Sequence, residues 1–267
     1  MIATDIFLEI GSQHKVCEDY IIQGMNPEPY IILSDGCSSS NNTEMGARIL
    51  CHLAKKYIQY RSDDLHELDY RKMGQWIIHN AEMVARQLGL SVNCLDATLI
   101  IAYHLDDQIY VYMYGDGAIV TKDGGRIEVH KIDYTKNAPY YLSYQIDEAR
   151  HDLYHEMGND VSVTISGPDG ESCGVYAYDY PAYFSFSAKG LDTLFITSDG
   201  LFSFIVESPT ERRVVAEGDV LPDFMNFKNV KGEFLTRRLK KALKKLKNGD
   251  INHFDDLSIG AFISIED

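Results

Sequence analysis

Hydrophobic residues alternate with polar ones, or form short continuous runs, along much of this chain, and this pattern predicts a series of β-strands. Residues 2–11 and 19–34 have this character. Between residues 97 and 130, three or four runs rich in Ile, Val and Tyr are separated by turn residues, which predicts an antiparallel meander. A last strand-like run covers residues 257–265. Residues 131–190 hold short strand-like pieces and turn clusters and are the hardest part to interpret.

Three further segments have the 3.6-residue spacing of amphipathic helices. The first begins at Thr43, which we expect to be its N-cap, and continues to about Tyr60. The second covers residues 64–90, with Gly89 near its end. The third, residues 231–247, is basic and directs Phe234, Leu235, Leu239, Leu243 and Leu246 inward. This order of elements predicts an α+β fold with antiparallel sheets covered by helices, and we expect one domain over residues 1–267.

Composition narrows the classes of function. The 267 residues are 45% hydrophobic, which suffices for a sizeable core. The net charge of −15 argues against nucleic-acid and anionic-membrane partners, because both require a cationic surface. The five cysteines include no Cys-x-x-Cys pair, so neither a disulfide framework nor a structural zinc site is supported. With no signal peptide or membrane-length apolar run, we expect a cytoplasmic protein.

Acidic residues recur where the apolar runs end. Asp35, Asp116 and Asp199 each follow such a run and each precede a glycine, while Asp255-Asp256 comes directly before the last run. A carboxylate at a strand end sits on a rigid stem, and the glycine lets the backbone approach a cation closely. Hard oxygen ligands favour Mg²⁺ or Mn²⁺ over zinc.

A single Asp-Gly pair is most often a hairpin turn. Asp123-Gly124 and Asp169-Gly170 have polar, flexible neighbours, and we expect them to be such plain turns. The remaining copies are more informative together, because four widely spaced strand ends can converge on one metal site through the fold.

In their order along the chain, these motifs resemble those of the metal-dependent serine/threonine protein phosphatases of the 2C type. The resemblance extends from about Gly11 to Ile263. It is carried by the acidic pair Glu18-Asp19, the Asp35-Gly36 pair, the strand start Ala97-Thr98-Leu99, the turn Gly115-Asp116-Gly117, the signature Ser198-Asp199-Gly200-Leu201 and the closing motif Asp255-Asp256-Leu257-Ser258.

The resemblance implies a sandwich of two antiparallel β-sheets flanked by α-helices, with Mn²⁺ or Mg²⁺ at one end. It further implies hydrolysis of phosphoserine and phosphothreonine in proteins by a water that two metals activate, so that no protein nucleophile is needed. The expected partner is a phosphorylated protein substrate, and we expect a monomer.

The same resemblance implies the metal ligands, and a third, looser metal is part of it. Asp35 would bridge the two metals and the Gly36 carbonyl would join the second. Asp199 and Asp255 would hold the first, while Asp19 with Glu18 would hold or orient metal-bound water. Asp116 would help Asp199 to bind the third metal.

Two departures from the family pattern concern the phosphate. His14 stands where the family commonly has a phosphate-gripping arginine, and an unperturbed histidine would help most when protonated, below about pH 6.5. The loop 37–42 contains no glycine, unlike the family's Gly-rich loop, and must follow another path. These departures favour an alternative, a catalytically silent pseudophosphatase or regulatory binding module of the same fold. A phosphatase of a small phosphorylated metabolite is a third interpretation.

Three weaker candidates remain. His151 and His155 stand one helical turn apart, but the glutamate of the zinc-protease motif is missing. The lysines of residues 240–247 form a face that could bind an acidic partner or simply be solvated. The tyrosines between residues 134 and 183 could line a peptide groove or pack within a sheet.

Overall fold

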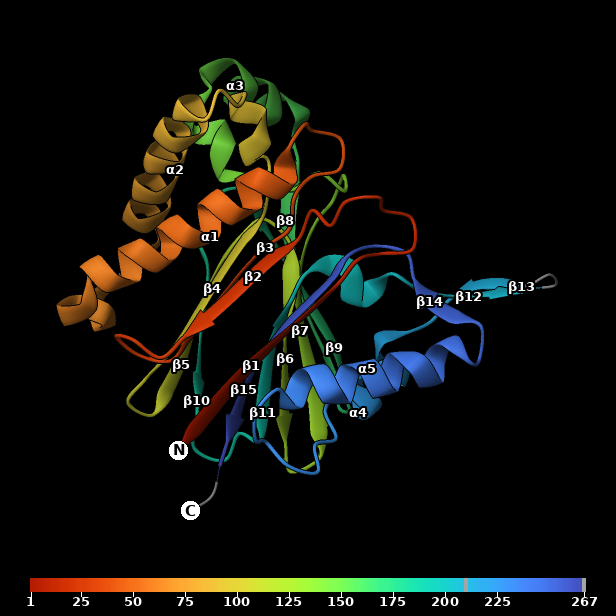
Figure 1. The fold of residues 1–267 in the computed structure, drawn as a ribbon. Coiled ribbons are helices and arrows are strands. Elements are labelled where there is room, and N and C mark those ends of the chain that lie inside the picture. The colour runs from red at the N-terminus through yellow and green to blue at the C-terminus, as the bar shows by residue number, and fades with distance from the viewer. Residues whose placement is uncertain (209–210, 266–267) are drawn as a thin grey trace.

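Two antiparallel sheets form the centre of the protein, for which a computed structural model describes residues 1–208 and 211–265 (Figure 1). In order across the larger sheet, the strands are β1 (Ile2–Glu9), β15 (Leu257–Ser264), β11 (Thr193–Thr197), β6 (Gly117–Asp123), β7 (Arg126–Tyr134), β8 (Asp160–Gly167) and β9 (Gly170–Ala177). The smaller sheet contains β10 (Ala182–Ser187), β5 (Gln108–Tyr114), β4 (Leu99–Leu105), β3 (Tyr30–Ser34) and β2 (Tyr20–Gly24). A separate small sheet is formed by β13 (Glu211–Val214), β12 (Phe204–Ser208) and β14 (Ile251–His253).

Helices cover the outer faces of both main sheets. Helices α1 (Thr43–Tyr60) and α2 (Tyr70–Gln87) pack on the smaller sheet, and α4 (Glu217–Phe224) and α5 (Phe234–Lys247) pack on the larger one (Figure 1). Helix α3 (Glu148–Met157) and the short 3₁₀ segment η3 (Leu142–Ile146) lie near one end of α2. The predicted α+β sandwich with flanking helices is therefore confirmed.

Three hydrophobic clusters hold these layers together. The central one lies between the sheets and includes Ile31, Ile100, Ile119, Ile196 and Phe262. The other two fill the spaces between each sheet and its helices. Strands buried on both faces explain why the runs that end at the acidic motifs are apolar without interruption.

The helix predictions are correct in position but not in every detail. The first helix has its predicted bounds, but Thr43 is not its N-cap: Asn42 takes that position, and the Thr43 hydroxyl donates to Glu18 Oε1 at 3.0 Å. The predicted helix over 64–90 is divided into a 3₁₀ segment, η1 (Ser62–Glu67), and α2. Asp69 separates them and caps α2 by accepting a hydrogen bond from the Lys72 N–H at 2.8 Å.

The predicted meander is wrong in one respect that concerns the site. β4 and β5 pair in the smaller sheet, whereas β6 and β7 pair in the larger one, so the chain changes sheets at Gly115-Asp116-Gly117. Gly115 and Gly117 have φ values of +90° and +131°, which only glycine adopts readily. The turns at Asp123-Gly124 and Asp169-Gly170 are plain hairpin connections between β6 and β7 and between β8 and β9, as predicted.

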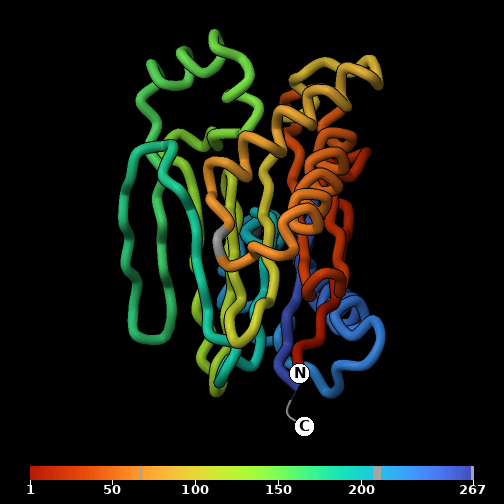
Figure 2. The backbone as a smooth tube through the Cα atoms, turned by 90° about the vertical axis from the view of Figure 1, so that its left-hand side faces the viewer, coloured from red at the N-terminus to blue at the C-terminus, as the bar shows by residue number. Residues whose placement is uncertain are grey.

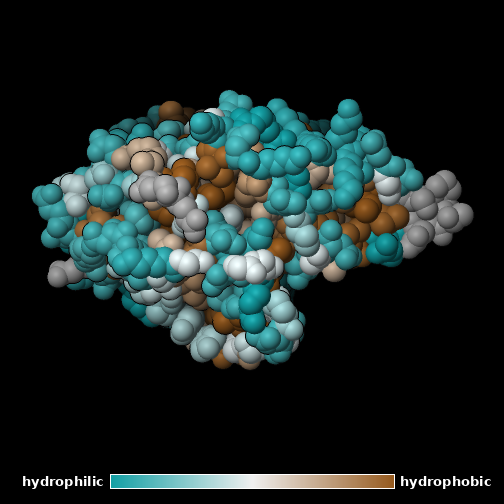
Figure 3. All heavy atoms as spheres, turned by 90° about the horizontal axis from the view of Figure 1, so that it is seen from below, coloured by the Kyte–Doolittle hydropathy of each residue, from teal (hydrophilic) through white to brown (hydrophobic). Residues whose placement is uncertain are grey.

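The two ends of the described chain lie side by side (Figure 2): the Met1 amino group donates to the Ile265 carbonyl at 3.1 Å. Seen from below, hydrophilic residues cover most of the surface, with smaller hydrophobic areas between them (Figure 3). Within residues 1–208 and 211–265, none of the helices combines the length and hydrophobicity needed to cross a bilayer.

Candidate metal centre

The acidic strand ends meet because of the strand register. In the smaller sheet Tyr20 pairs with Ser34, so Asp19 and Asp35 lie at the same edge. In the larger sheet Thr197 pairs with both Ala118 and Ile259, so Asp116, Asp199 and Asp255 lie near one common edge. The two edges face each other across the sandwich, and electrostatic interactions join Asp35 to the other four carboxylates.

Backbone hydrogen bonds fix the position of Asp35. Its N–H donates to Thr98 Oγ1 at 3.1 Å, and its carbonyl accepts from the Thr98 N–H at 2.8 Å. Gly36 continues this contact by bridging to Ala97. A Cβ at Gly36 would lie 2.8 Å from the Thr43 Cβ, so only glycine fits between α1 and this strand end.

Two other glycines allow distant segments to approach Asp255 and Asp256. A Cβ on Gly200 would lie 1.9 Å from the Asp256 carbonyl oxygen, and one on Gly11 would lie 2.4 Å from the Asp255 carbonyl carbon. Both contacts are with backbone, which cannot move aside easily. These glycines therefore allow the turn at Asp199 and the loop before Asp19 to pack against the last acidic motif.

Burial, assisted by neighbouring negative charges, disfavours the ionised forms of four of these carboxylates. Burial, together with the negative charges of Asp19, Asp199, Asp116 and Asp255, raises the pKa of Asp35 well above its ordinary value. Burial is also the largest cause that raises the pKa values of Asp19, Asp116 and Asp199. A bound cation would reverse this effect, because its positive charge favours the ionised carboxylates.

Two buried carboxylate oxygens at this end of the sandwich have no hydrogen-bond partner within residues 1–208 and 211–265. They are Asp19 Oδ1 and Asp199 Oδ1. The other oxygen of Asp19 accepts from the Ser198 hydroxyl at 2.8 Å. Buried polar atoms are normally paired, so an unpaired carboxylate oxygen beside other carboxylates fits a hard divalent cation. Among the described residues, no three His, Cys, Asp or Glu side chains are preformed as a coordination set.

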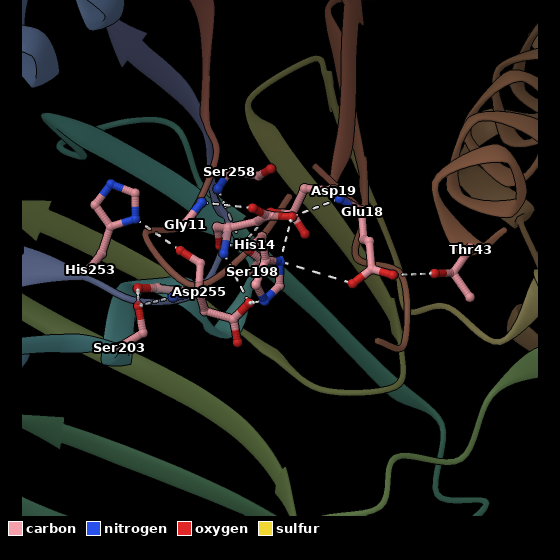
Figure 4. A network of polar contacts seen from close by, with 12 residues as sticks. Gly11, His14, Glu18, Asp19, Thr43, Ser198, Ser203, His253, Asp255 and Ser258 are labelled. Atoms are coloured by element: carbon pink, nitrogen blue, oxygen red, sulfur yellow. Dashed lines mark hydrogen bonds and ion pairs between the residues drawn. The ribbon is translucent and has the colours of Figure 1, made fainter. Parts of the chain in front are cut away.

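Beside this edge, Asp256 forms a second arrangement, which we call the loop clasp: Asp256, His14 and the backbone N–H groups of Gly11 and Glu18. Asp256 Oδ1 accepts from Gly11 at 2.7 Å and Oδ2 accepts from Glu18 at 2.6 Å. His14 Nδ1 lies 3.1 Å from Asp256 Oδ2, and Nε2 lies 3.2 Å from Asp255 Oδ1. Figure 4 shows His14 between Asp255 on one side and Glu18 on the other.

The environments of His14 and Glu18 shift both pKa values upward. Burial lowers the pKa of His14, but the nearby Asp256, Asp255 and Glu18 carboxylates outweigh it and raise the pKa above its usual value. Burial raises the pKa of Glu18, although the Thr43 hydroxyl and His14 partly oppose this. His14 therefore faces carboxylates with both ring nitrogens, an arrangement that the sequence pattern did not predict.

Lys131, a basic residue beside the carboxylates, is marked by no sequence motif and was not among the predicted site residues. Its Nζ lies 2.7 Å from Asp133 Oδ2 and 4.7 Å from the centre of the Phe202 ring. Its charge partly lowers the pKa values of Asp116 and Asp199 against the larger effect of burial. Lys131 pairs with Ala118 across β6 and β7, so the strand register, rather than any motif, brings it to the site.

A cavity of about 660 Å³ adjoins the turn that carries Asp116. It is lined by residues of α2, η3, α3 and the segment 178–180, and includes Gly115. Tyrosines form much of the lining: Tyr70, Tyr114, Tyr134, Tyr140, Tyr144, Tyr178 and Tyr180. His151 belongs to this lining and contacts the Tyr140 hydroxyl at 2.9 Å, while His155 packs against the Tyr178 ring.

Solved structures with a similar fold are bacterial phosphatases. A bacterial serine phosphatase aligns with a TM-score of 0.61 and 12% identity over 100% of this chain and 99% of that chain. Serine/threonine phosphatase Stp1 from Staphylococcus aureus aligns with a TM-score of 0.61 and 13% identity, covering 100% and 96%. The catalytic domain of the phosphatase PstP, in complex with 2 manganese ions, gives a TM-score of 0.53 and 15% identity, covering 99% of each.

These identities are low, so the structural likeness concerns the fold. A comparison with curated proteins gave no match. The sequence profile described as Protein phosphatase 2C, however, matches residues 11–244, which is most of the chain. The chain therefore belongs to the protein phosphatase 2C family.

Proposed function

We propose that this chain is a metal-dependent phosphatase that hydrolyses phosphoserine and phosphothreonine monoesters in proteins, with residues 1–267 acting as one catalytic domain. The observation that carries the proposal is the meeting of five carboxylates at one end of the sandwich, two of them with a buried oxygen that has no partner among the described residues.

The donor set fits Mn²⁺ or Mg²⁺, because it consists of hard oxygens without cysteine or an available histidine. Asp35 would bridge two cations, and the Gly36 carbonyl would join one of them. Asp199 and Asp255 would complete the first position, Asp19 and Glu18 would hold or orient water, and Asp116 with Asp199 would hold a third, looser cation. When bound, the cations would screen the phosphate charge and lower the pKa of the attacking water.

The surrounding residues would orient these ligands. The Ser198 hydroxyl holds one oxygen of Asp19, which leaves the other directed toward the centre. His14 Nε2, 3.2 Å from Asp255 Oδ1, would fix that carboxylate, and with Lys131 it supplies positive charge beside an otherwise acidic site. We propose that the two together serve the role of the family's missing arginine toward the phosphate.

The tyrosine-lined cavity supports a protein substrate over a small metabolite. It adjoins Gly115 and has space for the residues that flank a phosphorylated side chain. Arg71 and Asp179 form an ion pair at 3.2 Å on its rim, where they can contact peptide backbone or charged side chains.

The alternative function, a silent regulatory module, is favoured by one observation. Both ring nitrogens of His14 already face carboxylates, so this residue does not reach freely toward a phosphate as the family's arginine would.

One experiment separates these functions. Hydrolysis of p-nitrophenyl phosphate and of a phosphothreonine peptide is measured for the wild type and Asp199→Asn, with Mn²⁺ and with EDTA. We expect Mn²⁺-dependent turnover that falls on the order of 10³-fold in the variant, because a lost ligand removes several kcal/mol of transition-state stabilisation. Full activity in Asp199→Asn would contradict the proposal. No turnover despite a Mn²⁺-dependent rise in melting temperature would favour the silent module.

A further inference from the structure

Helix α5 carries an unusual concentration of positive charge for so acidic a chain. Its 14 residues hold seven of the chain's 25 lysines and arginines and no acidic residue. The buried residues Leu235, Leu239 and Leu243 attach its inner face to the larger sheet. The basic residues must therefore lie along the remaining sides of the helix.

The basic residues on two sides of α5 differ in their ion pairing. On the side toward α4, Lys245 and Arg238 form ion pairs with Asp223, with N–O distances of 2.6 and 3.4 Å. On the side toward β14, Lys240, Lys244 and Lys247 recur at helical spacing and line a groove of about 410 Å³. Within residues 1–208 and 211–265, these three lysines form no ion pair.

The opposite wall of this groove leads directly to the candidate metal centre. It is formed by residues 9–12 and by Ile251, Asn252 and His253. The Ser12 N–H donates to the His253 carbonyl at 3.2 Å, and the Gly11 N–H donates to Asp256. The groove is thus bordered by the two segments that continue into His14 and Asp255.

We propose that this groove, between α5 and β14, binds an acidic segment of the phosphoprotein substrate and holds it beside the metal centre. This inference rests on the proposed function. From Lys240 to Lys247 the helix rises about 10 Å, which matches roughly three residues of an extended peptide. Carboxylates of such a segment would pair with the three lysines. Glu9 lies on the opposite wall, 3.6 Å from His253 Nε2, and its negative charge would keep the carboxylates on the lysine side of the groove.

Charge complementarity favours a peptide over an anionic membrane. An amphipathic helix binds a membrane by inserting its apolar face, and here that face is buried against the sheet. The surrounding protein is strongly acidic and would be repelled by an extended anionic surface, whereas a short segment can remain within the basic groove.

A matched pair of variants tests the groove. Lys240→Glu/Lys244→Glu reverses two groove lysines, and Lys231→Glu/Lys241→Glu makes the same change in charge at exposed positions outside the groove. Binding of a fluorescein-labelled peptide rich in Glu and Asp is followed by fluorescence anisotropy at about 50 and about 300 mM NaCl. In parallel, p-nitrophenyl phosphate turnover is measured with Mn²⁺, since this small substrate does not need the groove.

We expect the wild type and the control to bind the peptide, with affinity that falls as salt rises, and the groove variant to bind at least roughly fivefold more weakly. All three proteins should hydrolyse p-nitrophenyl phosphate at similar rates. Equal peptide binding by the groove variant, or an equal loss in the control, would overturn the docking site. Binding of phosphatidylserine vesicles that depends on the groove lysines, without peptide binding, would overturn it in favour of a membrane.

Failure of the docking site is distinguishable from failure of the proposed function. If no protein turns over p-nitrophenyl phosphate but the peptide still binds through the groove lysines, the phosphatase proposal fails and the acidic docking site stands. If turnover is normal and the groove variant binds the peptide as well as the wild type does, only the docking site is contradicted.

Discussion

Asp19 and Asp256 are buried to the same degree, yet they belong to regions of opposite character. Each has a relative exposure of 1%. Asp256, in the loop clasp, has both oxygens occupied by backbone N–H groups. Asp19, in the candidate metal centre, has one oxygen held by Ser198, and the other has no partner in the part of the chain that the structure describes. Burial alone therefore does not distinguish these two carboxylates, whereas hydrogen bonding does: Asp256 is satisfied within the fold, and Asp19 keeps an oxygen that a cation could use under the proposed function.

A third carboxylate supports this distinction. Asp5 is 5% exposed and lies within β1 opposite Ala261, and it accepts hydrogen bonds from the backbone N–H groups of Ile6 and Leu235. Like Asp256, it joins segments distant in the sequence. The satisfied acids Asp5 and Asp256 join segments of this fold, whereas a cation could pair with the free oxygen of Asp19 under the proposed function.

The largest effect on stability is expected at the clasp. Asp256→Ala removes the acceptor for two buried N–H groups, so we expect the free energy of unfolding to fall by about 3 kcal/mol. Urea denaturation monitored by circular dichroism, with EDTA present, measures this loss. Asp256→Asn keeps one acceptor oxygen and should lose less. A stability of Asp256→Ala equal to that of the wild type would show that the clasp does not hold the 11–18 loop.

In the candidate metal centre, we expect a substitution to raise the free energy of unfolding rather than lower it. Asp35→Asn removes an acidic group whose pKa is raised by burial and by the negative charges of the neighbouring carboxylates. Without metal, the free energy of unfolding of the variant should rise by about 1 kcal/mol, because like-charge repulsion is reduced. This corresponds to a melting temperature roughly 2 °C higher.

With Mn²⁺ the order of the two proteins should reverse, because under the proposed function the wild type would bind the cation and Asp35→Asn would not. Differential scanning fluorimetry with EDTA and with Mn²⁺ measures both effects. If Asp35→Asn were destabilised in EDTA, Asp35 would resemble the clasp residues rather than a metal ligand.

The comparison also explains what could be predicted from the sequence. The strand ends that carry Asp35, Asp116 and Asp199 were visible because buried strands give uninterrupted apolar runs and glycine follows each acid. The convergence of these ends was implied by the order of the motifs and is produced by strand register.

Three features were not predictable from local pattern. Whether β5 and β6 belong to one sheet depends on packing between sheets, which the alternation of residues does not record. The role of Thr43 depends on Glu18, 25 residues away in sequence, which competes for its hydroxyl. Lys131 reaches the site only through pairing of β6 with β7, and no motif marks it.

Glu18 lies between the two regions, and the smallest predicted effect decides to which it belongs. Its backbone N–H donates to Asp256 in the clasp, while its side chain accepts from Thr43 and lies 3.9 Å from His14 Nδ1. Glu18→Gln keeps the backbone contact and a hydrogen-bond acceptor for Thr43 but removes the charge. We expect the free energy of unfolding in EDTA to change by less than about 0.5 kcal/mol. We expect kcat with Mn²⁺ to fall roughly tenfold, as for a residue that orients water rather than holding the metal. A loss as large as that of Asp199→Asn would make Glu18 a direct ligand. An unchanged kcat would instead place its side chain with the clasp, where only its backbone matters.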